Sequence, residues 1–369
     1  MGDGDSLAGR RVSLSAGAFH LLATLVLFAL SALFTRIMIR VNLVDTPNHR
    51  SSHARPTPKS GGIAIALSYA LGAFVLFTQS ETIKIGTPAF VMHLGLAFIL
   101  LAAGLADDLR ELKPLTKLAI QLVIATIFSV AVVAIDAVPL PFFGTVGLGP
   151  LSVPVTVLWI VAVMNLVNFM DGINGLVSGT AMIAAAALAL LTSVYDAPFV
   201  HFSALLLLAA TAGFFIFNFP GGRIFLGDTG SMFLAYLLAT LTVMGPRVEG
   251  AHVSLYVVPI LISPLLFDAI FTIAVRARRG EKIWVAHRDH LYQQLVRAGL
   301  SHVQVSALYF GLALFACVAA FIAQTGDPTH GLYALLGLVP VYAAFALWVH
   351  RVVARRSPSP SGRGNPWAE

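Results

Sequence analysis

The sequence has few charged residues and almost no cysteine, and each shortage excludes a class of protein. Asp, Glu, Lys and Arg make up 11% of the 369 residues. Soluble domains carry roughly 25%, so we interpret the chain as an integral membrane protein. Cys317 is the only cysteine. A disulfide within one chain is therefore excluded, redox chemistry is not expected, and Cys317 is interpreted as a small packed hydrophobe.

Long apolar runs fill most of the chain. A helix needs about 20 apolar residues to cross the hydrocarbon core of a bilayer. The runs do not alternate like barrel strands, and backbone groups in lipid need internal partners, so we predict helices. The predicted spans lie near residues 18–39, 61–79, 88–106, 115–135, 152–170, 175–194, 199–217, 229–245, 253–275, 303–324 and 331–350. The predicted fold class is all-α, a polytopic membrane protein with about eleven transmembrane helices.

The positions of the basic residues predict the topology. All but four of the 23 Lys and Arg residues lie around the loops after odd-numbered spans or in the C-terminal tail; the exceptions are Arg10, Arg11, Lys84 and Arg247. Basic residues concentrate on the cytoplasmic side of membrane proteins. The N-terminus is therefore predicted to be periplasmic and the C-terminus cytoplasmic. The net charge of +6 follows from this arrangement, and we expect no nucleic-acid partner.

The domain organisation is predicted to be simple. We expect a single transmembrane domain over residues 1–350, without an internal repeat. The first span is too long for a signal-peptide core and is interpreted as a retained helix. Residues 351–369 are rich in Pro, Ser and Gly, which predicts a disordered cytoplasmic tail.

Polar residues gather in five loops, after the first, third, fifth, seventh and ninth spans. The loops read NHRSSHARPTPKSGG, ADDLRELKPLTK, NLVNFMDGINGL, NFPGGRIFLGDTGS and RARRGEKIWVAHRDHLYQQL. A chain that crosses the bilayer at every span places these five loops on one face. We therefore predict a composite site at the cytoplasmic surface of the membrane.

Two of these loops carry acidic and amide residues that favour a functional site. Asp107 and Asp108 end the third span. They could simply mark where that helix leaves the bilayer, but adjacent carboxylates repel each other unless a cation is near, so a metal-dependent or proton-accepting site is the alternative. Asn165 and Asn168 share a helix face, and Asp171 continues the stripe. Such polar residues are functional by default, with helix–helix hydrogen bonding as the other interpretation.

Asp228 lies between Gly227 and Thr229 at the start of the eighth span. It could cap that helix. Alternatively, the neighbouring glycines let a phosphate approach backbone amides at a helix N-terminus, and Asp228 holds a cation that bridges the phosphates. Mg²⁺ usually takes one or two protein oxygens and completes its shell with water and substrate phosphate. Asn168 and Asp228 would suffice as its protein ligands.

The last of the five loops is the most basic. Its first three arginines are interpreted mainly as topology anchors. Leu291, Leu295 and Val296 share a helix face, which predicts an amphipathic helix at the membrane interface. The residues before this helix that could reach a diphosphate are His287, Arg288 and His290. A solvated basic surface is the alternative interpretation.

Together the five loops resemble the polyprenyl-phosphate N-acetylhexosamine-1-phosphate transferases, over about residues 40–300. The resemblance implies a transmembrane enzyme of the bacterial inner membrane with its site on the cytoplasmic face. It implies transfer of a sugar 1-phosphate from a UDP-N-acetylhexosamine to undecaprenyl phosphate, releasing UMP. The implied metal is Mg²⁺, with Mn²⁺ as an alternative. The reaction would be the first membrane step of O-antigen or related cell-surface glycan synthesis.

The resemblance also implies roles for individual residues. Asp107, Asp108 and Asp228 match the catalytic carboxylates, and Asn168 and Asp228 match the metal ligands. Lys117 matches a phosphate-binding lysine. The uracil-binding positions fall on Asn174, Asn218 and Phe225, with Phe225 supplying the stacking face. The pyrophosphate and sugar-recognition loop corresponds to His287, Arg288 and His290.

The last loop departs from one branch of the family. Transferases that use UDP-MurNAc-pentapeptide have consecutive histidines there, whereas this chain has His290, Leu291, Tyr292 and Gln293. We therefore expect a donor of the amino-deoxy sugar type, as in the O-antigen-initiating branch, and we expect Tyr292 and Gln293 at the rim of the donor pocket. Direct attack of the lipid phosphate on the β-phosphorus is favoured over a route through an aspartyl-phosphate, and both stay open.

Two other functions are compatible with parts of the pattern. A transporter of an anionic lipid-linked or nucleotide substrate would place its site near the bilayer midplane, often between two related halves. Here the polar groups cluster at one face and the halves show no symmetry. A CDP-alcohol phosphotransferase is a nearer rival, but its multi-Asp helix motif has no match. The oligomeric state stays open, with a homodimer as one alternative.

Overall fold

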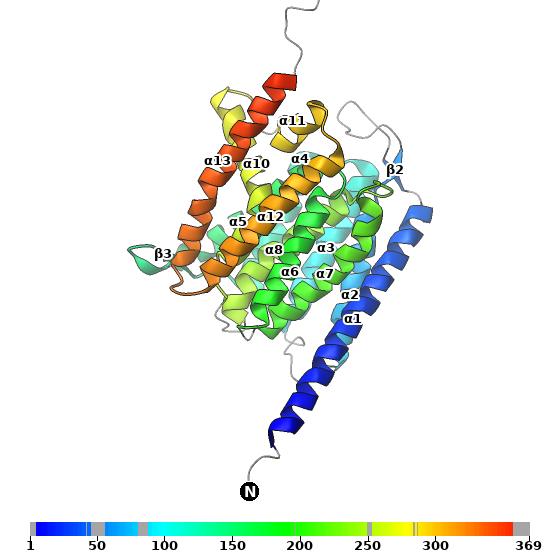
Figure 1. Cartoon of the computed structure of the whole chain (residues 1–369), viewed down its shortest axis with the longest axis vertical. Helices are drawn as coiled ribbons and strands as arrows, with labels where there is room; N and C mark the ends of the chain where they lie inside the picture. Colours follow the sequence, from blue (N-terminus) through cyan, green and yellow to red (C-terminus); the bar gives the residue numbers. More distant parts are fainter. Residues whose placement is uncertain are drawn as a thin grey trace, which may run out of the picture.

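The computed structural model describes residues 5–41, 43–45, 56–79, 88–195, 197–248, 253–282, 285 and 287–356. Helices make up most of the described chain (Figure 1), as predicted. They are α1 Asp5–Val41, α2 Gly61–Gln79, α3 Pro88–Arg110, α4 Pro114–Ala131, α5 Ser152–Phe169, α6 Leu176–Thr192, α7 Pro198–Asn218, α8 Gly227–Val248, α9 Val257–Leu261, α10 Ser263–Arg278, α11 Leu291–Arg297, α12 His302–Gln324 and α13 His330–Arg356. Two antiparallel hairpins pair β1 Val44–Asp45 with β2 Thr57–Pro58, and β3 Ala137–Leu140 with β4 Gly144–Gly147.

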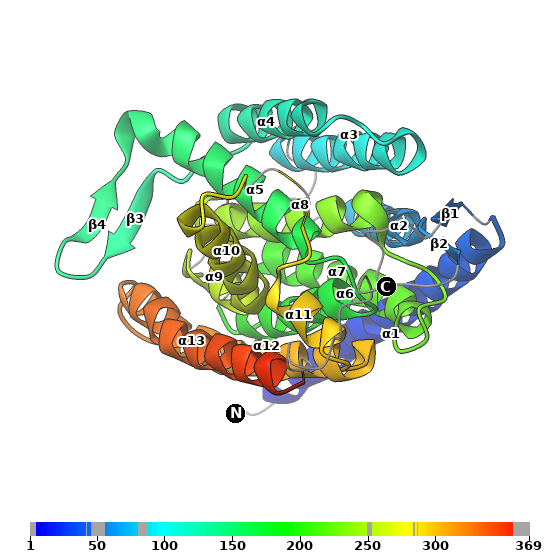
Figure 2. The same ribbon diagram turned by 90° about the horizontal axis from the view of Figure 1, so that it is seen from above.

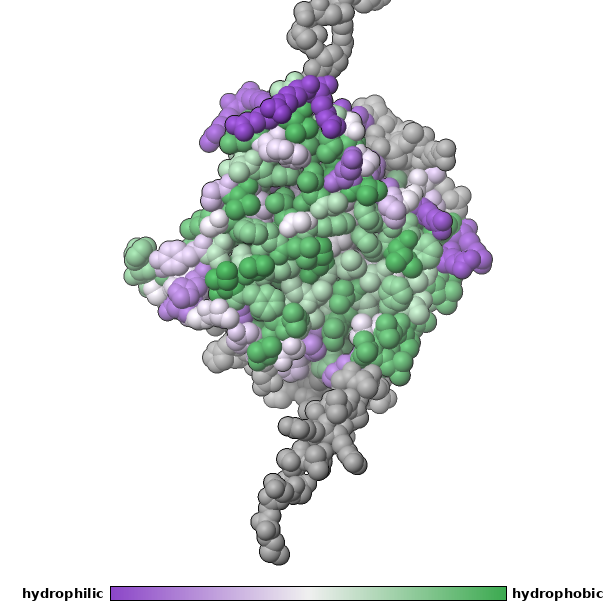
Figure 3. Space-filling model, viewed as in Figure 1, coloured by the Kyte–Doolittle hydropathy of each residue, from purple (hydrophilic) through white to green (hydrophobic). Residues whose placement is uncertain are grey.

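The lengths and composition of the helices confirm a polytopic membrane protein. Eight helices of the described part are long and apolar enough to cross a bilayer, and α2 and α6 are shorter apolar helices. The start of α1 and the end of α13 lie at opposite ends of the bundle (Figure 1). Apolar residues cover the middle of the face in Figure 3, and hydrophilic residues gather at the end where α13 finishes. Which end faces the cytoplasm stays a prediction.

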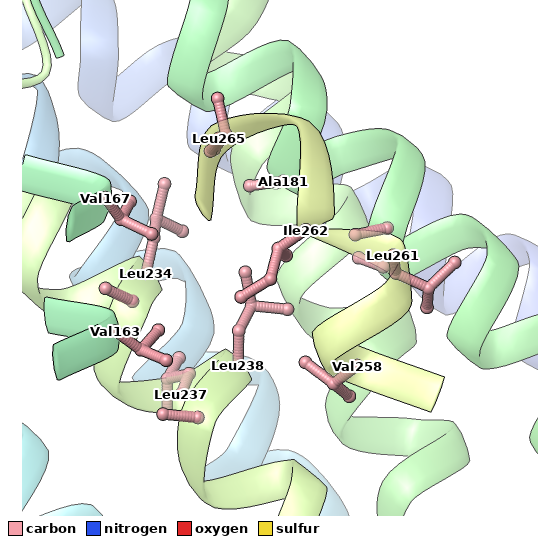
Figure 4. Packing of buried hydrophobic residues seen from close by; sticks show 14 of the residues in the cluster. Val163, Val167, Ala181, Leu234, Leu237, Leu238, Val258, Leu261, Ile262 and Leu265 are labelled. Atoms are coloured by element: carbon pink, nitrogen blue, oxygen red, sulfur yellow. The ribbon is translucent and has the colours of Figure 1, made fainter. Parts of the chain in front are cut away.

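Helix α8 forms the centre of the bundle. In its span Gly227–Pro246, 94% of the residues of the most apolar stretch are buried inside the protein, against 33% in the spans of α3 and α5 that pack on it. Burial of this helix on all sides requires apolar residues around its whole circumference. Figure 4 shows part of the resulting core, where side chains from α5, α8, α9 and α10 pack together. The labelled residues include Val163, Val167, Leu234, Leu238, Leu261 and Leu265.

The ninth predicted span is not one helix. It is divided into α9 and α10 at Ile262. Pro264 has no backbone N–H to donate to the carbonyl of Ile260, so the helix cannot continue unchanged. The hydroxyl of Ser263 donates to that carbonyl instead, at 2.6 Å. The prediction of a continuous span over 253–275 is therefore wrong, and the proline is the physical reason.

Three other expectations differ from the structure or lie outside it. The fourth span ends at Ala131, and the chain then forms the β3–β4 hairpin, which extends to one side of the bundle (Figure 2). Residues 351–356, predicted to belong to a disordered tail, are the helical end of α13, and the rest of that predicted tail lies outside the described residues. The part of the first loop over residues 46–55 lies outside the described residues.

Candidate active site

The predicted loops meet around the first turn of α8. The backbone amides of Gly61 and Gly62 each donate at 3.0 Å, to the carbonyls of Phe225 and Leu226 respectively. The amide of Phe225 donates in turn to the carbonyl of Pro58, at 2.7 Å. These bonds join the end of the first loop to the strip that leads into α8. Side chains around the loops that follow the third and fifth spans reach the same turn.

Glycines allow the helices to cross closely at this point. A Cβ atom on Gly62 would lie 2.2 Å from the amide nitrogen of Gly230, and one on Gly104 would lie 2.7 Å from Cα of Thr229. Gly227 has φ +74°, and its Cβ would lie 2.5 Å from the carbonyl oxygen of Lys59. Gly227 and Gly230 therefore serve helix packing. The approach of a phosphate to these glycines stays a prediction.

Asp108 caps α8 from a neighbouring helix. Its Oδ1 accepts the backbone N–H of Asp228 at 3.1 Å, and its Oδ2 accepts the backbone N–H of Thr229 at 3.0 Å. The hydroxyl of Thr229 also donates to Oδ2, at 2.6 Å. The first amides of a helix have no partner within the helix, and Asp108 supplies one. The interpretation of Asp228 as the cap of its own helix is therefore wrong.

Asp107 points to a different partner. Its buried carboxylate forms an ion pair through Oδ2 with the ammonium group of Lys117 on α4, and its Oδ1 accepts the backbone N–H of Leu112 at 2.7 Å. The same ammonium group lies 2.9 Å from Oδ2 of Asp228. The side chains of Lys117 and Asp228 are each 32% exposed. Lys117 therefore bridges two carboxylates where the cluster opens to solvent.

Asn168 completes the environment of Asp228. Its side-chain amide donates to Oδ1 of Asp228 at 3.0 Å and to the hydroxyl of Ser231 at 2.8 Å. Lys117 and Asn168 therefore hold the two carboxylate oxygens of Asp228 from opposite helices, α4 and α5. We call Lys117, Asn168 and Asp228 the upper polar layer.

A second polar layer lies one helical turn deeper on the same three helices. It consists of Gln121 on α4, Asn165 on α5 and Met232 on α8. The amide of Asn165 donates to Oε1 of Gln121 at 2.6 Å, and Nε2 of Gln121 contacts the sulfur of Met232 at 3.5 Å. We call these three residues the lower polar layer.

Asp171 adds a further acidic group beside the cluster. It follows the end of α5, and its backbone N–H donates to the carbonyl of Asn168 at 3.1 Å. Burial and, to a smaller extent, the negative charges of Asp228 and Asp108 together raise the pKa of its carboxyl to about 8. Asp171 therefore lies within the electrostatic field of the other carboxylates.

The cluster has an excess of negative charge that suits a divalent cation. The carboxylates of Asp107 and Asp228 share the ammonium group of Lys117, and the carboxylate of Asp108 lies against the same turn of α8. Among the residues that the structure describes, no group of three or more His, Cys, Asp or Glu could hold a metal by itself. Mg²⁺ needs only one or two protein oxygens when substrate phosphate and water complete its shell. The partly exposed carboxylate of Asp228 fits this role, and Asn168 fits it once its amide turns to present oxygen.

The last loop lies beside the end of α5. His290 is 3% exposed, and its ring centroid lies 4.9 Å from that of His287 and 6.4 Å from that of Phe169. Arg288 is half-buried in the same segment. Burial lowers the pKa of His287, and the nearby His290 and Arg276 contribute to that shift. The segment 287–290 therefore borders the loop that carries Asp171.

Tyr292 does not occupy the position expected from the sequence. It is 1% exposed, and its hydroxyl donates to the carbonyl of Phe169 at 3.3 Å. A Cβ on Gly172 would lie 2.1 Å from that hydroxyl. Tyr292 therefore packs against the loop after α5 and does not line a pocket rim. Leu291 and Leu295 are fully buried, so the apolar face of α11 packs on α12 and α13.

The expected nucleobase residues lie together around the ends of α6 and α7. Asn218 is buried: its Oδ1 accepts the N–H of Gly175 at 2.8 Å, and its Nδ2 donates to the carbonyl of Ile224 at 2.9 Å. Asn174 donates to the carbonyl of Pro220 at 3.3 Å. Phe225 is half-buried, three residues before Asp228. In this conformation Asn218 joins the start of α6 to the segment before α8 through these hydrogen bonds. Its contact with a nucleobase stays a prediction.

Two features of the site were not predicted from the sequence. One is the lower polar layer, for which the four-residue spacing of Lys117 and Gln121 was an available signal. The other is Asp268, a carboxylate on α10 that is 1% exposed. An ionisable residue inside a predicted span is itself a signal of function.

Comparison with known proteins gives a consistent result. The glycosyl transferase family 4 model matches residues 89–246. The decaprenyl-phosphate N-acetylglucosaminephosphotransferase of Mycobacterium tuberculosis is 30% identical over 322 residues, which cover 78% of each chain. A probable undecaprenyl-phosphate N-acetylglucosaminyl 1-phosphate transferase of Bacillus subtilis is 27% identical over 324 residues, 86% of this chain and 88% of its own. The undecaprenyl-phosphate alpha-N-acetylglucosaminyl 1-phosphate transferase of Yersinia pestis is 24% identical over 335 residues, 88% and 86%.

Proposed function

This chain belongs to the polyprenyl-phosphate N-acetylhexosamine-1-phosphate transferases of glycosyl transferase family 4, and we propose that it uses a UDP-N-acetylhexosamine as donor. The acceptor is a polyprenyl phosphate, with undecaprenyl phosphate as the expected carrier. The products are a lipid-linked sugar diphosphate and UMP. The observation that carries this proposal is the cluster of Asp107, Lys117, Asn168 and Asp228 at one end of an apolar bundle, in a chain whose relatives bear these activities in their names.

The reaction requires two anionic phosphates to meet. An oxygen of the lipid phosphate attacks the β-phosphorus of the nucleotide sugar, and the bond between that phosphorus and the bridging oxygen breaks, so UMP leaves with the electron pair. Positioning and electrostatic stabilisation dominate such transfers. Lys117, already 2.9 Å from Asp228, offsets negative charge next to the reacting phosphates. Asp107 holds this ammonium group in place, and we propose it as the group that accepts a proton from the lipid phosphate.

The metal we propose is Mg²⁺, with Mn²⁺ as a substitute. When bound, it would offset phosphate charge and stabilise the charge that develops during transfer. Asp228 and Asn168 would hold it. Asp108 acts indirectly, because its bonds to the amides of Asp228 and Thr229 fix the start of α8. Asn174, Asn218 and Phe225 form the proposed uracil site, and His287, Arg288 and His290 form the proposed diphosphate and sugar site.

The location follows from the same reasoning. An acceptor that is anchored in lipid brings its phosphate to the membrane surface, which is where the cluster would lie. We propose the cytoplasmic face of the bacterial cytoplasmic membrane, because the basic residues gather at that end. A place in O-antigen or lipopolysaccharide synthesis is a narrower hypothesis within cell-surface glycan synthesis.

One experiment tests the class and the donor together. Purified protein is incubated with undecaprenyl phosphate, Mg²⁺ and a panel of UDP-N-acetylhexosamines, and UMP and lipid-linked product are measured. We expect both products in equal amounts with at least one donor, and neither with the Asp228→Asn variant. A protein that forms no lipid-linked product with any donor would contradict the proposal, and uptake of substrate without UMP release would favour the transporter alternative.

A further inference from the structure

Asp268 is the most deeply buried carboxylate that the reaction scheme leaves unused. It lies on α10, within the ninth predicted span, and is 1% exposed. A charged group in such a place is costly unless hydrogen bonds and opposite charges compensate for the lost water. The contacts of Asp268 show how this cost is offset.

The contacts of Asp268 come mainly from the loop that carries the basic residues. Its Oδ1 accepts the backbone N–H of Leu291 at 2.9 Å, and its Oδ2 accepts the backbone N–H of Tyr292 at 3.1 Å. The hydroxyl of Tyr309 on α12 donates to Oδ2, and that of Thr272 donates to Oδ1 at 3.1 Å. The two backbone amides belong to the first turn of α11, whose N-cap residue makes no side-chain capping bond. Asp268 therefore caps α11 from α10.

The same carboxylate faces His290. Nδ1 of that ring lies 3.4 Å from Oδ1 of Asp268. This contact is a close approach and not a hydrogen bond, because Nδ1 makes no hydrogen bond within the described part of the chain. His290 is also held on its flat side by Tyr292, with a centroid distance of 5.8 Å and an interplanar angle of 19°. Asp268 therefore holds the end of the 287–290 segment through the backbone amides of Leu291 and Tyr292, which directly follow His290.

We propose that Asp268 is a positioning residue for recognition of the nucleotide sugar. It holds α11 and His290 against the loop after α5, where Tyr292 contacts Phe169. It acts on the diphosphate and sugar end of the donor, and it leaves the uracil end and the Asp107–Lys117–Asp228 cluster unchanged. This inference rests on the proposed role of His290 in binding the donor.

The chain supplies a matched pair of variants for the test. Tyr309 and Tyr342 are both buried, at 0% and 2% exposure, and the hydroxyl of each bonds a residue of α10. Tyr309 bonds Asp268, whereas Tyr342 bonds Ser263. Replacing either by Phe removes one hydroxyl and leaves the ring in place. Only Tyr309→Phe disturbs the carboxylate.

The expected results separate positioning from folding. Asp268→Asn leaves one of the two backbone amides facing an NH₂ group, so one hydrogen bond to the carboxylate is lost. Hydrogen bonds to charged groups are among the stronger ones. The KM for the UDP-sugar should therefore rise at least about tenfold. UMP lacks the sugar and the β-phosphate, which are the groups that the 287–290 segment would bind. Its dissociation constant should therefore change less than about twofold. Tyr309→Phe should raise the KM a few-fold, and Tyr342→Phe should leave it unchanged.

A double-variant cycle then shows whether Asp268 acts through His290. His290→Ala should raise the KM, and adding Asp268→Asn to it should have little further effect. If His290→Ala leaves the KM unchanged, the donor site itself is placed wrongly. If His290→Ala raises the KM while Asp268→Asn and Tyr309→Phe do not differ from Tyr342→Phe, only the inference about Asp268 is overturned. Should Asp268→Asn not fold, the comparison of Tyr309→Phe with Tyr342→Phe still decides.

Discussion

Asp108 accepts the backbone N–H of Asp228 at 3.1 Å, and this single contact separates the roles of two adjacent acidic residues. Asp108 fixes the start of α8, whereas Asp107 forms an ion pair with Lys117. Neighbouring side chains on a helix point about 100° apart, which explains how two consecutive carboxylates reach different partners.

The first prediction follows from this division. Asp107→Asn should lower turnover at least about a hundredfold, because it removes a charge that orients Lys117 beside the phosphates. It should leave UDP-sugar binding nearly intact. Asp108→Asn should destabilise the protein by about 1 kcal/mol, the usual cost of a lost helix cap, as well as lowering turnover. Turnover and thermal unfolding in detergent, measured on both variants, check this. Wild-type turnover in both would contradict it.

The second prediction concerns the metal. Asp228→Ala and Asp228→Asn should each lower turnover at least about a hundredfold, because a charged oxygen ligand is needed beside the phosphates. Chelation of divalent cations should abolish activity, Mg²⁺ should restore it, and Mn²⁺ should restore part of it. The assay is UMP release before and after dialysis against EDTA. Full activity in EDTA would overturn the metal assignment.

The third prediction concerns the lower polar layer. Asn165 donates to Gln121 at 2.6 Å, one turn below Asn168 and Lys117. Gln121→Leu and Asn165→Leu should each lower turnover about tenfold, because a small displacement of the upper layer is costly in phosphoryl transfer. The two effects should not add, since both variants break the same bond. Ser129→Ala on α4 is the control, because Ser129 bonds only the carbonyl of Ala125 in its own helix. Additive losses would show that the bond does not matter.

The fourth prediction concerns the nucleobase. Stacking of a base on an aromatic ring is worth roughly 1–3 kcal/mol, so Phe225→Ala should weaken UMP binding about five- to hundredfold. Phe143→Ala in the β3–β4 hairpin is the control, because Phe143 is 78% exposed and lies on the hairpin away from α8. Calorimetry on both variants gives the comparison. An unchanged affinity in Phe225→Ala would remove this residue from the site and leave it as an aromatic anchor at the membrane surface.

The fifth prediction concerns the donor. UDP-N-acetylhexosamines, including 6-deoxy forms, should be used, and UDP-MurNAc-pentapeptide should not, because this chain has His290, Leu291, Tyr292 and Gln293 where the transferases that use that large donor have consecutive histidines. Competition among donors, followed by analysis of the lipid product, checks this. Efficient transfer from UDP-MurNAc-pentapeptide would refute it. Tyr292 plays no direct part in the expectation, since it is buried against the loop after α5.

Much of the fold was predictable because lipid imposes strong rules on sequence. Apolar runs of sufficient length gave the helices, and their order placed Asp107, Asn168 and Asp228 at one end. The break between α9 and α10 was overlooked because hydropathy does not register Pro264. The β3–β4 hairpin was overlooked because its strands are four residues long, too short for a clear pattern.

The candidate site was predictable only in part. The residues themselves could be identified, but not which of them bond each other. Whether Asp108 or Asp228 caps α8 depends on how α3 crosses α8, which is a matter of three-dimensional packing at Gly104. Tyr292 illustrates the same limit: its position after His290 gave no sign that its hydroxyl turns toward Phe169.

The central claim is that a sugar and its phosphate move together to a lipid carrier. It is tested most directly with a UDP-N-acetylhexosamine labelled with ³²P at the β-phosphorus, incubated with the purified protein, undecaprenyl phosphate and Mg²⁺. We predict that the label moves entirely into the lipid fraction and that the released UMP carries none. Label retained in UDP, or released as free phosphate while the lipid stays unlabelled, would contradict the account.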